Sequence, residues 1–528
     1  MRKIKTIAAC VLAIVMLLPS WAATSAYANS DRTAHTGQMG FFGGISEGVR
    51  LPRTTEIILQ QNNSPNLTNL TYMEMIWLTG EPIEWEGVMT KTLSAGRGRA
   101  ATPNAGTREV RYRIGDSDSS PDGVSVERDI RFTVNWRREG NQIVEVFTIA
   151  QPNHWRETIS LDGTTFTLDP RRSDFNISIL RDITPGVTYY VGDFAMRAVF
   201  ISGDATITKE VVGEIFGYES AWSAAETQRL VGIISHSDGW QMQYEVIPSV
   251  AMSKDLQYSP TQPTLISFDG NYREVMSNQS ALVYTIHTMP AFMYGLWPTS
   301  GRASINSFNT FEQLIAPNLG FLRGHWAYGD IRRLFAMEVL RGDPTHFQPN
   351  QGVSRGEFVT MLARAIKLPL DEAHTRPPVA NRQGINNAVT VIFPDVWHGR
   401  PDFAYIMASN FAGIAIGRGD GHFQPDQIIE RQEAYALALR ALGLSNLGMA
   451  PTPITPFADD HLLGDWARRD VYAATRIGLI APDDNGLLHP TRLMTKSEAA
   501  ALINRLIEYM RHNLQQDYTE NIINFIGN

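Results

Sequence analysis

The sequence predicts a multidomain protein in which a β-rich N-terminal region, sandwich- or barrel-like, precedes an all-α region of three repeats. Up to about residue 290, apolar residues alternate with polar ones, which is the period of strands with one buried face. After about residue 320 they recur at helical spacing. In that second half, one helix–loop–helix pattern occurs three times, and this indicates a repeat architecture.

The first 28 residues have the pattern of a secretory signal peptide. Met1–Lys5 is basic, Ile7–Leu18 is apolar, and Ala26–Ala28 is a small-x-small cleavage site. Cys10 is the only cysteine, so the chain after the signal has no disulfide and no thiolate metal site. We expect a secreted protein with no membrane segment after cleavage.

The charge of the chain argues against nucleic acid as a partner. The formal net charge is −8, and residues 321–528 hold 20 basic and 22 acidic side chains, so the acid is concentrated before residue 321. An acidic surface repels the phosphate backbone.

The front half is expected to be built from antiparallel strands. In the stretch 128–136, Ile130, Phe132, Val134 and Trp136 share one face and polar residues the other. Residues 107–320 are assigned to one or more β-rich domains, and the Asn-, Gly- and Thr-rich residues 29–106 have no predicted structure.

The repeats are expected at residues 321–368, 393–444 and 457–512, with a tail at 513–528. Each has a first helix, a glycine-bearing loop, a charged tetrad and a second helix. The loops end in Phe347-Gln-Pro349, Phe423-Gln-Pro425 and Leu488-His-Pro490, and the tetrads are Ser354–Glu357, Glu430–Glu433 and Thr495–Glu498.

This ordered pattern resembles the S-layer homology (SLH) family. The resemblance implies a three-repeat bundle that holds a secreted protein on the bacterial cell wall or S-layer surface. It implies as partner a secondary cell-wall polysaccharide that is acidic and often pyruvylated, and it leaves self-association in a surface layer open. Residues 29–320 resemble no family that we recognise.

The loop Ala415–Asp426 allows four interpretations. Arg418–Asp420 is a cell-adhesion tripeptide, yet the second copy, Arg341–Asp343, falls at a different offset from the preceding helix, 10 rather than 12 residues. A phosphate loop would need a preceding strand, and a calcium loop would need more oxygen ligands. We therefore expect a structural turn in which Phe423 fills the core.

The tetrads supply the candidate site residues. We expect helix caps at Ser354, Glu357, Glu433, Thr495 and Glu498. Each tetrad also has a cation in the first helical turn, which opposes the helix dipole. A bound anion would resolve this conflict, and an ordinary surface ion pair is the alternative. The candidate polysaccharide-binding cations are Arg355, Arg431 and Lys496.

Two tryptophans begin first helices in the repeats. Trp326 and Trp466 are retained as candidate polysaccharide-binding residues, although their size favours a role as wedges in the core.

The front half has no motif that identifies an enzyme. Asp116, Asp118 and Asp122 depart from the calcium-loop pattern, and Glu81, Glu84 and Glu86 are too close in sequence to predict a glycosidase pair. We therefore assign no catalytic residue, metal or cofactor. A non-enzymatic, wall-anchored surface protein is favoured, and a wall-anchored polysaccharide hydrolase with its catalytic domain in 29–320 is the alternative.

Overall fold

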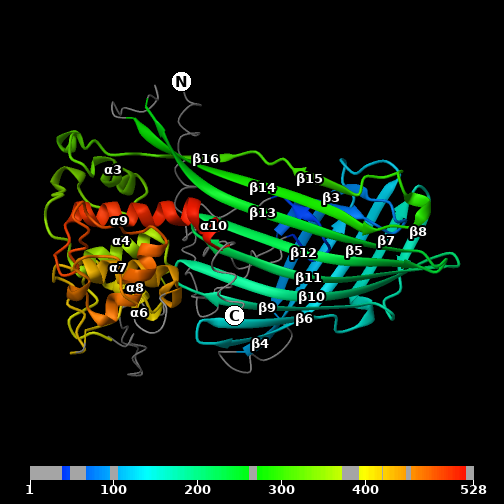
Figure 1. The fold of residues 1–528 in the computed structure, drawn as a ribbon, viewed down its shortest axis with the longest axis horizontal. Coiled ribbons are helices and arrows are strands. Elements are labelled where there is room, and N and C mark those ends of the chain that lie inside the picture. The colour runs from blue at the N-terminus through cyan, green and yellow to red at the C-terminus, as the bar shows by residue number, and fades with distance from the viewer. Residues whose placement is uncertain are drawn as a thin grey trace, which may run out of the picture.

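The computed structural model describes residues 39–47, 67–95, 105–260, 270–370, 392–418, 420–447 and 453–518. They form a long antiparallel sheet region and a helical region at one end of it (Figure 1). The signal segment lies outside the described residues. Within the described residues, no helix has the length and apolar character needed to cross a membrane.

In the described part of the chain, sixteen strands belong to one sheet, and most of them pair with their neighbours in the chain. The strands are β1 (Ile45–Ser46), β2 (Leu67–Ile76), β3 (Ile83–Ala95), β4 (Ala105–Gly115), β5 (Val124–Glu139), β6 (Gln142–Thr148), β7 (Trp155–Leu161), β8 (Thr164–Leu168), β9 (Asp174–Ile183), β10 (Val187–Ser202), β11 (Ala205–Ser220), β12 (Ser223–His236), β13 (Gln241–Ser259), β14 (Asn271–Thr288), β15 (Ser300–Ile305) and β16 (Thr310–Leu314). The β7–β8 hairpin bridges β5 and β10, while β6 and β9 connect the same two strands further along.

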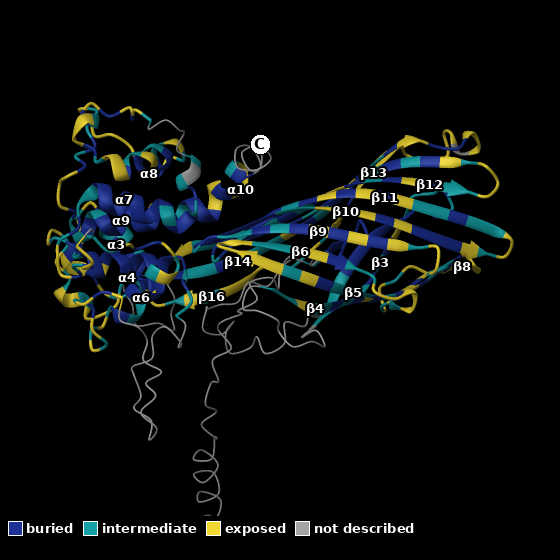
Figure 2. Ribbon diagram, turned by 90° about the horizontal axis from the view of Figure 1, so that it is seen from below, coloured by how far each residue is buried: buried dark blue, intermediate teal, exposed yellow. Residues whose placement is uncertain are grey.

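The sheet curls around its own core. In Figure 1, β3, β5 and β7 lie behind the layer formed by β9–β14. The first strand of the sheet approaches its last strands, where the Ser280 hydroxyl on β14 donates to the Ser46 carbonyl on β1 at 2.6 Å. Buried and exposed residues alternate along the strands (Figure 2), so one face of each strand contributes to a shared aromatic-rich interior.

Part of the unassigned region 29–106 belongs to this same sheet. Strands β1, β2 and β3 lie within it, and β4 crosses the expected boundary at residue 106. The β-rich region is therefore one continuous sheet that starts earlier than expected. The apolar alternation is weak here because β2, Leu-Thr-Asn-Leu-Thr-Tyr-Met-Glu-Met-Ile, does not keep a strict period of two.

Among its described residues, the helical region contains two main helices in each repeat. The first helices are α3 (Tyr328–Ala336), α6 (Phe403–Phe411) and α8 (Asp465–Arg476), and the second helices are α4 (Arg355–Ala365), α7 (Arg431–Leu442) and α9 (Lys496–Glu508). The expected tail from residue 513 starts as a continuation of α9, through a π-helical turn, Tyr509–Asn513, and α10 (Leu514–Asp517).

Backbone bridges join the three repeats, so the region is helical without being all-α. The Val353 N–H donates to the Met494 carbonyl at 3.0 Å, Met494 to Ile429 at 2.9 Å, and Ile429 back to Val353 at 3.1 Å. These bonds close a ring with one member from each repeat, just before each second helix. A propensity-based prediction misses them because isolated bridges have no period.

The C-terminal ends of α4, α7 and the α9 continuation contact the sheet. Trp222 Nε1 donates to the Ala365 carbonyl at 2.8 Å, and the Gly186 N–H donates to Ala441 at 2.7 Å. The Ser223 hydroxyl donates to the carbonyl of Met510. At the ends of α4 and α7, sheet groups thus satisfy carbonyls that a helix end leaves without an intrahelical partner.

Candidate functional site

The second helices begin at three equivalent junctions between repeats. At the first helical position, a backbone N–H donates to a backbone carbonyl of another repeat. The pairs are Arg355 to Gln427 at 2.8 Å, Arg431 to Arg492 at 3.0 Å, and Lys496 to Gln351 at 2.8 Å. Each acceptor belongs to the next repeat of the ring. The three candidate cations therefore occupy equivalent places, one at each junction.

Capping boxes occupy the same helix starts. The Ser354 hydroxyl accepts the Glu357 N–H while the Glu357 carboxylate accepts the Ser354 N–H, and Thr495 and Glu498 repeat this pair. In the second repeat the Glu433 carboxylate accepts the N–H of the preceding cap residue at 3.3 Å. These helix-start N–H groups are used within the protein, so a bound anion would have to be held by side chains.

Arg355 is enclosed at its junction. Its side chain is 7% exposed, Nη2 donates to the Ile416 carbonyl at 2.7 Å, and the guanidinium lies 4.8 Å from the Phe423 ring centroid. Nη1 is 3.4 Å from Glu433, which also accepts a 2.6 Å hydrogen bond from Arg418. Two guanidinium groups thus share one carboxylate and leave a local positive surplus. Burial lowers the pKa of Arg355.

Arg431 is more open. Nε donates to the Tyr435 hydroxyl at 2.9 Å, and Arg431 forms no ion pair with any residue that the structure describes. The neighbouring Gln432 accepts the Gly464 N–H at 3.0 Å. The Trp466 ring packs against Gly464, since a Cβ there would lie 2.7 Å from Nε1. An available guanidinium and an exposed indole thus belong to the same junction.

Lys496 forms an ion pair across its junction. Nζ lies 2.9 Å from Oε1 of Glu357, the capping carboxylate of the first repeat. This is the surface-pair alternative considered from the sequence, and an anionic ligand would have to compete with Glu357 for the ammonium group.

The expected core role of the tryptophans is wrong. Trp326 and Trp466 are 63% and 52% exposed. A third indole, Trp397, is 62% exposed in the second repeat and packs over Gly399. The sequence analysis named only Trp326 and Trp466 and missed Trp397, which lies six residues before its first helix begins at Phe403. Each repeat therefore presents one exposed indole near the start of its first helix.

Two carboxylates fix the loops that end in Phe423 and Leu488. Asp395 accepts the N–H groups of Phe423 and Gln424 at 3.0 and 2.6 Å, and Asp459 accepts those of Leu488 and His489 at 2.9 and 2.7 Å. Phe423 is fully buried, which confirms its expected role in the core. These hydrogen bonds lower the pKa of Asp395 against the opposing effect of its burial.

Charged side chains of both adhesion tripeptides are hydrogen-bonded to neighbouring residues of the protein. Arg418 pairs with Glu433, and Asp420 accepts the His422 N–H at 3.0 Å. In the first repeat, Asp343 accepts the Thr345 N–H at 2.9 Å. Arg418 is nevertheless a site residue that the sequence did not identify, because only the fold brings it next to Arg355.

The front-half candidates form no site among the described residues. Asp116 accepts bonds from Trp85, Ser125 and Val126, and no cluster of three or more His, Cys, Asp or Glu able to hold a metal is found in the described part of the chain. Glu84 and Glu86 flank the buried Trp85 on β3.

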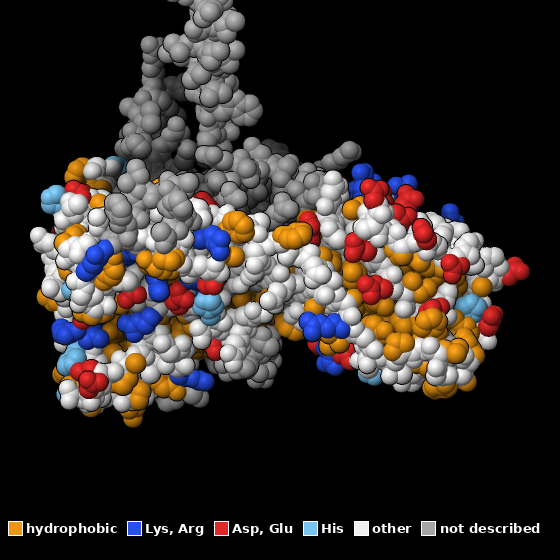
Figure 3. Space-filling model, turned by 90° about the horizontal axis from the view of Figure 1, so that it is seen from above, with side chains coloured by type: hydrophobic (Ala, Val, Ile, Leu, Met, Phe, Trp, Pro, Cys, Tyr) orange, Lys and Arg blue, Asp and Glu red, His pale blue; other side chains and the backbone are white. Residues whose placement is uncertain are grey.

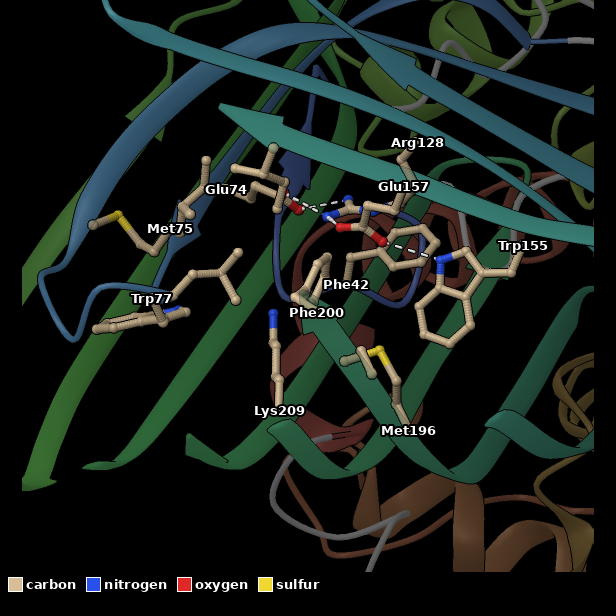
Figure 4. A pocket seen from close by; sticks show the side chains of 14 residues that line it. Phe42, Glu74, Met75, Trp77, Arg128, Trp155, Glu157, Met196, Phe200 and Lys209 are labelled. Carbon is tan, nitrogen blue, oxygen red and sulfur yellow. Dashed lines mark hydrogen bonds and ion pairs between the residues drawn. The ribbon is translucent and has the colours of Figure 1, made fainter. Parts of the chain in front are cut away.

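A different carboxylate pair lies inside the sheet (Figure 4). Arg128 binds Glu74 through two 2.9 Å hydrogen bonds and Glu157 through one of 2.6 Å. Trp155 donates to Glu157 at 3.0 Å, and Lys209 points into the same chamber. Burial lowers the pKa of Lys209. The cavity measures about 20 Å³, room for roughly one water molecule and too small for a sugar ring.

Sequence comparison identifies the helical region. The family model of the S-layer homology domain matches residues 322–359 and 456–500, within the first and third repeats. These repeats are S-layer homology domains. The second repeat, which lies between the matched segments, shares their helix-start geometry and the backbone ring.

Similar proteins include both enzymes and layer proteins. An amylopullulanase of Thermoanaerobacterium thermosulfurigenes is 30% identical over 194 residues, which are 35% of this chain and 9% of that protein. An endoglucanase of Bacillus sp. strain KSM-635 is 28% identical over 34% of this chain and 18% of its own length. The S-layer protein sap of Bacillus anthracis is 28% identical over 34% of this chain and 20% of its own length.

The chain thus spans a fifth or less of these relatives, and each match covers about a third of the chain. The SLH repeats, together with the S-layer relatives, identify a secreted surface protein of the cell wall or S-layer.

Proposed function

We propose that this protein is anchored non-covalently to an acidic secondary cell-wall polysaccharide through its SLH repeats and displays the β-sheet region as an envelope component or binding module. The observation that carries the proposal is the threefold recurrence of a cation at each junction between repeats, in a region that presents one exposed indole per repeat. Guanidinium groups bind carboxylates through charge-assisted hydrogen bonds, and indole rings offer flat apolar faces to sugars.

The three junctions are not equal in this proposal. Arg431 is the principal anion-binding residue, because it has no acidic partner among the described residues and shares its junction with Trp466. Arg355 and Arg418 form a second, more enclosed cationic pair around Glu433. Lys496 is the weakest candidate, because Glu357 already holds its ammonium group. A pyruvate ketal or a uronate would supply the carboxylate.

Calorimetric titration of the full chain with purified wall polysaccharide tests the proposal. We expect Arg431→Ala to weaken binding by about 1.5–3 kcal/mol, the loss of one charge-assisted contact, and Arg431→Lys to recover part of it. Lys496→Ala serves as the matched control and should have a smaller effect. Removal of the acidic groups from the polymer should abolish the difference between parent and Arg431→Ala; equal affinities of the two for the intact polymer would refute the assignment.

The alternative, a wall-anchored hydrolase, has some support in the names of two relatives, but their similarity spans about a third of this chain. The Glu74–Glu157 pair inside the sheet shares Arg128 in a chamber of about 20 Å³, which favours a structural role for these carboxylates. Incubation of the full chain with wall and plant polysaccharides, followed by an assay for new reducing ends, tests the alternative directly.

A further inference from the structure

A group of arginines lies on the outer face of strands β4, β5 and β7. Arg111 and Arg113 belong to β4, Arg131 to β5 and Arg156 to β7. The residues next to them in these strands are buried, and because side chains alternate between the two faces of a strand, the arginines point outward. We call Arg111, Arg113, Arg131 and Arg156 the arginine face.

The register of the strands places these arginines in two adjacent rows across the sheet. One row is Thr90, Arg113, Asp129 and Arg156, and the next is Thr92, Arg111 and Arg131. Neighbouring strands are about 4.7–4.9 Å apart, and residues two positions apart on one strand are about 7 Å apart. Glu109 on β4 and Glu127 on β5 border the two rows. The arginine face is therefore a narrow cationic stripe that contains one carboxylate.

Only part of the arginine face has an acidic partner among the described residues. Asp129 accepts hydrogen bonds from Arg111 Nε at 2.7 Å and from Arg156 Nη2 at 2.9 Å. Arg113 and Arg131 form no ion pair with any residue in the described ranges. Arg131 also lies directly opposite Arg111, and like charges in this position destabilise a sheet. A bound anion would remove this conflict.

Hydroxyl groups, rather than aromatic rings, accompany the arginine face. Thr90 and Thr92 extend its two rows onto β3, and Thr158 and Ser160 follow Arg156 along β7. Arginine and hydroxyl side chains are groups that bind phosphate oxygens. Neither of the two described rows contains an aromatic side chain on which a nucleic-acid base could stack. The stripe therefore has the chemistry to bind a phosphate backbone without bases.

The acidic excess of the front half lies on other strands. Residues 173–320, which contain β9 to β16, hold 14 acidic and 7 basic side chains, whereas residues 105–172 hold 11 and 10. Strands β5 and β7 lie behind the layer of β9–β14 (Figure 1), and packed layers are about 10 Å apart. Charges at this distance are largely screened, because the Debye length is about 8 Å at physiological salt. On the sheet half of the molecule in Figure 3, Lys and Arg side chains gather in a few small groups rather than spreading evenly.

We propose that the arginine face binds a linear phosphodiester polymer of the cell wall. Two rows bordered by acids fit a single extended chain better than a broad surface. Cations about 5–7 Å apart suit a polymer with an anion in every short backbone unit, rather than one with a single carboxylate in each oligosaccharide repeat. The polymer and the site therefore differ from the acidic polysaccharide and the repeat junctions of the proposed function.

The arginine face would give the protein a second attachment to the wall. Once the repeats are bound, the face meets its polymer at a high effective concentration, so even a weak contact contributes to retention. Unsubstituted poly(glycerol phosphate) is a suitable probe, because it has a phosphodiester in each unit and no carboxylate.

Calorimetric titration of the full chain with poly(glycerol phosphate) tests the site. We expect the double variant Arg113→Gln, Arg131→Gln to bind at least about tenfold more weakly, because two charge-assisted contacts are lost, and the corresponding Lys variant to recover part of this. The slope of log K against log salt should become shallower by about 1.4, roughly 0.7 for each cation removed. The melting temperature should stay level or rise, since the opposition of Arg131 and Arg111 is relieved.

The matched control is the double variant Arg197→Gln, Arg229→Gln. It removes two outward arginines from β10 and β12, in the acidic layer, where each pairs with a glutamate. It should bind poly(glycerol phosphate) as the parent does.

Four outcomes would overturn the proposal. The parent could fail to bind poly(glycerol phosphate) even at low salt, or the Arg113→Gln, Arg131→Gln variant could bind it as tightly as the parent. Arg431→Ala could weaken this binding as much as the double variant does, which would place the polymer at the repeat junctions. Single-stranded DNA with the same number of phosphates gives the fourth: equal affinity would show that the face accepts any phosphodiester backbone and has no preference for a wall polymer.

Discussion

Arg355 and Arg431 occupy the same position in the repeat and have different surroundings. Arg355 is enclosed by a carbonyl, a ring and Glu433, whereas Arg431 contacts a tyrosine hydroxyl and has no acidic partner in the described part of the chain. The tetrads identify both cations in the sequence. The loop that covers Arg355, but not Arg431, belongs to a different repeat. Burial at this position therefore could not be predicted from sequence alone.

Arg355→Ala should destabilise the fold, while Arg431→Ala should not. Removing Arg355 leaves the Ile416 carbonyl without its donor and weakens the pairing of buried Glu433; unsatisfied buried groups cost about 1–3 kcal/mol each. Arg431 lies at a more open position, where loss of the cation also relieves the dipole conflict. Urea denaturation of both variants measures the difference, and equal midpoints would contradict this account of Arg355.

Because Lys91 is buried, we expect the stability of the protein to rise with pH in the alkaline range. Lys91 points into the sheet interior with 3% exposure, and burial lowers its pKa to about 8 from an ordinary value of 10.5. Between these values the unfolded chain binds the proton that the folded chain has released, so the free energy of unfolding increases with pH. Below pH 8 both states are protonated and the full cost of burying the charge remains.

Denaturation of the parent and of Lys91→Met between pH 7.5 and 10 checks this sign. The parent should gain stability across the window, and the variant should show a flatter profile. An equally steep profile in the variant would show that Lys91 is not the titrating group.

At the scale of elements, strands and helices followed from periodicity, whereas the connections between repeats did not. The alternating stretch 128–136 lies in β5, and the apolar spacing after residue 320 produced the predicted helix pairs. The Val353–Met494–Ile429 ring depends on three loops that are about 65–75 residues apart in sequence, and hydrogen bonds between single residues have no sequence signature.

The loop carboxylates explain why the Phe-Pro-Asp-Val motif contains an aspartate. Asp395 accepts two backbone N–H groups and so fixes Phe423 in the core, and Asp459 does the same for Leu488. The first repeat lacks the Phe-Pro-Asp-Val motif that carries Asp395, and its Phe347 is only partly buried. The aspartate thus acts as a loop anchor.

Asp395→Ala should loosen this loop. Hydrogen bonds to a charged group contribute about 1.5–3 kcal/mol, so we expect a destabilisation of about 2 kcal/mol. Hydrogen exchange of the Phe423 and Gln424 amides should accelerate, while the Leu488 and His489 amides at the intact Asp459 anchor serve as the internal control. Unchanged exchange at Phe423 would show that other contacts hold the loop.

At the scale of the whole molecule, the second helices carry their cations at one end and the sheet at the other. An 11-residue helix such as α4 is about 16 Å long at 1.5 Å per residue. The proposed polysaccharide junctions and the sheet contacts are therefore separated by the length of these helices. The sequence predicted two regions with different roles, but it gave no sign that they share a core, because the turn residues involved lie more than 100 positions before the helices that they contact.

Trp222 is the test of that shared core. It is 2% exposed, packs among buried residues of the helical region, and donates to the Ala365 carbonyl at 2.8 Å. Replacing a buried Trp by Ala costs about 3–5 kcal/mol, and here the loss falls on the contact between the two regions.

Calorimetry of the parent should show one cooperative transition, because neither region keeps its core intact without the other. Trp222→Ala should lower the melting temperature and split the transition in two, whereas Trp397→Ala, which removes an exposed indole of the same size, should leave a single transition. Two well-separated transitions in the parent would mean that the sheet and the SLH repeats unfold independently, and that the contacts at the helix ends do not couple them.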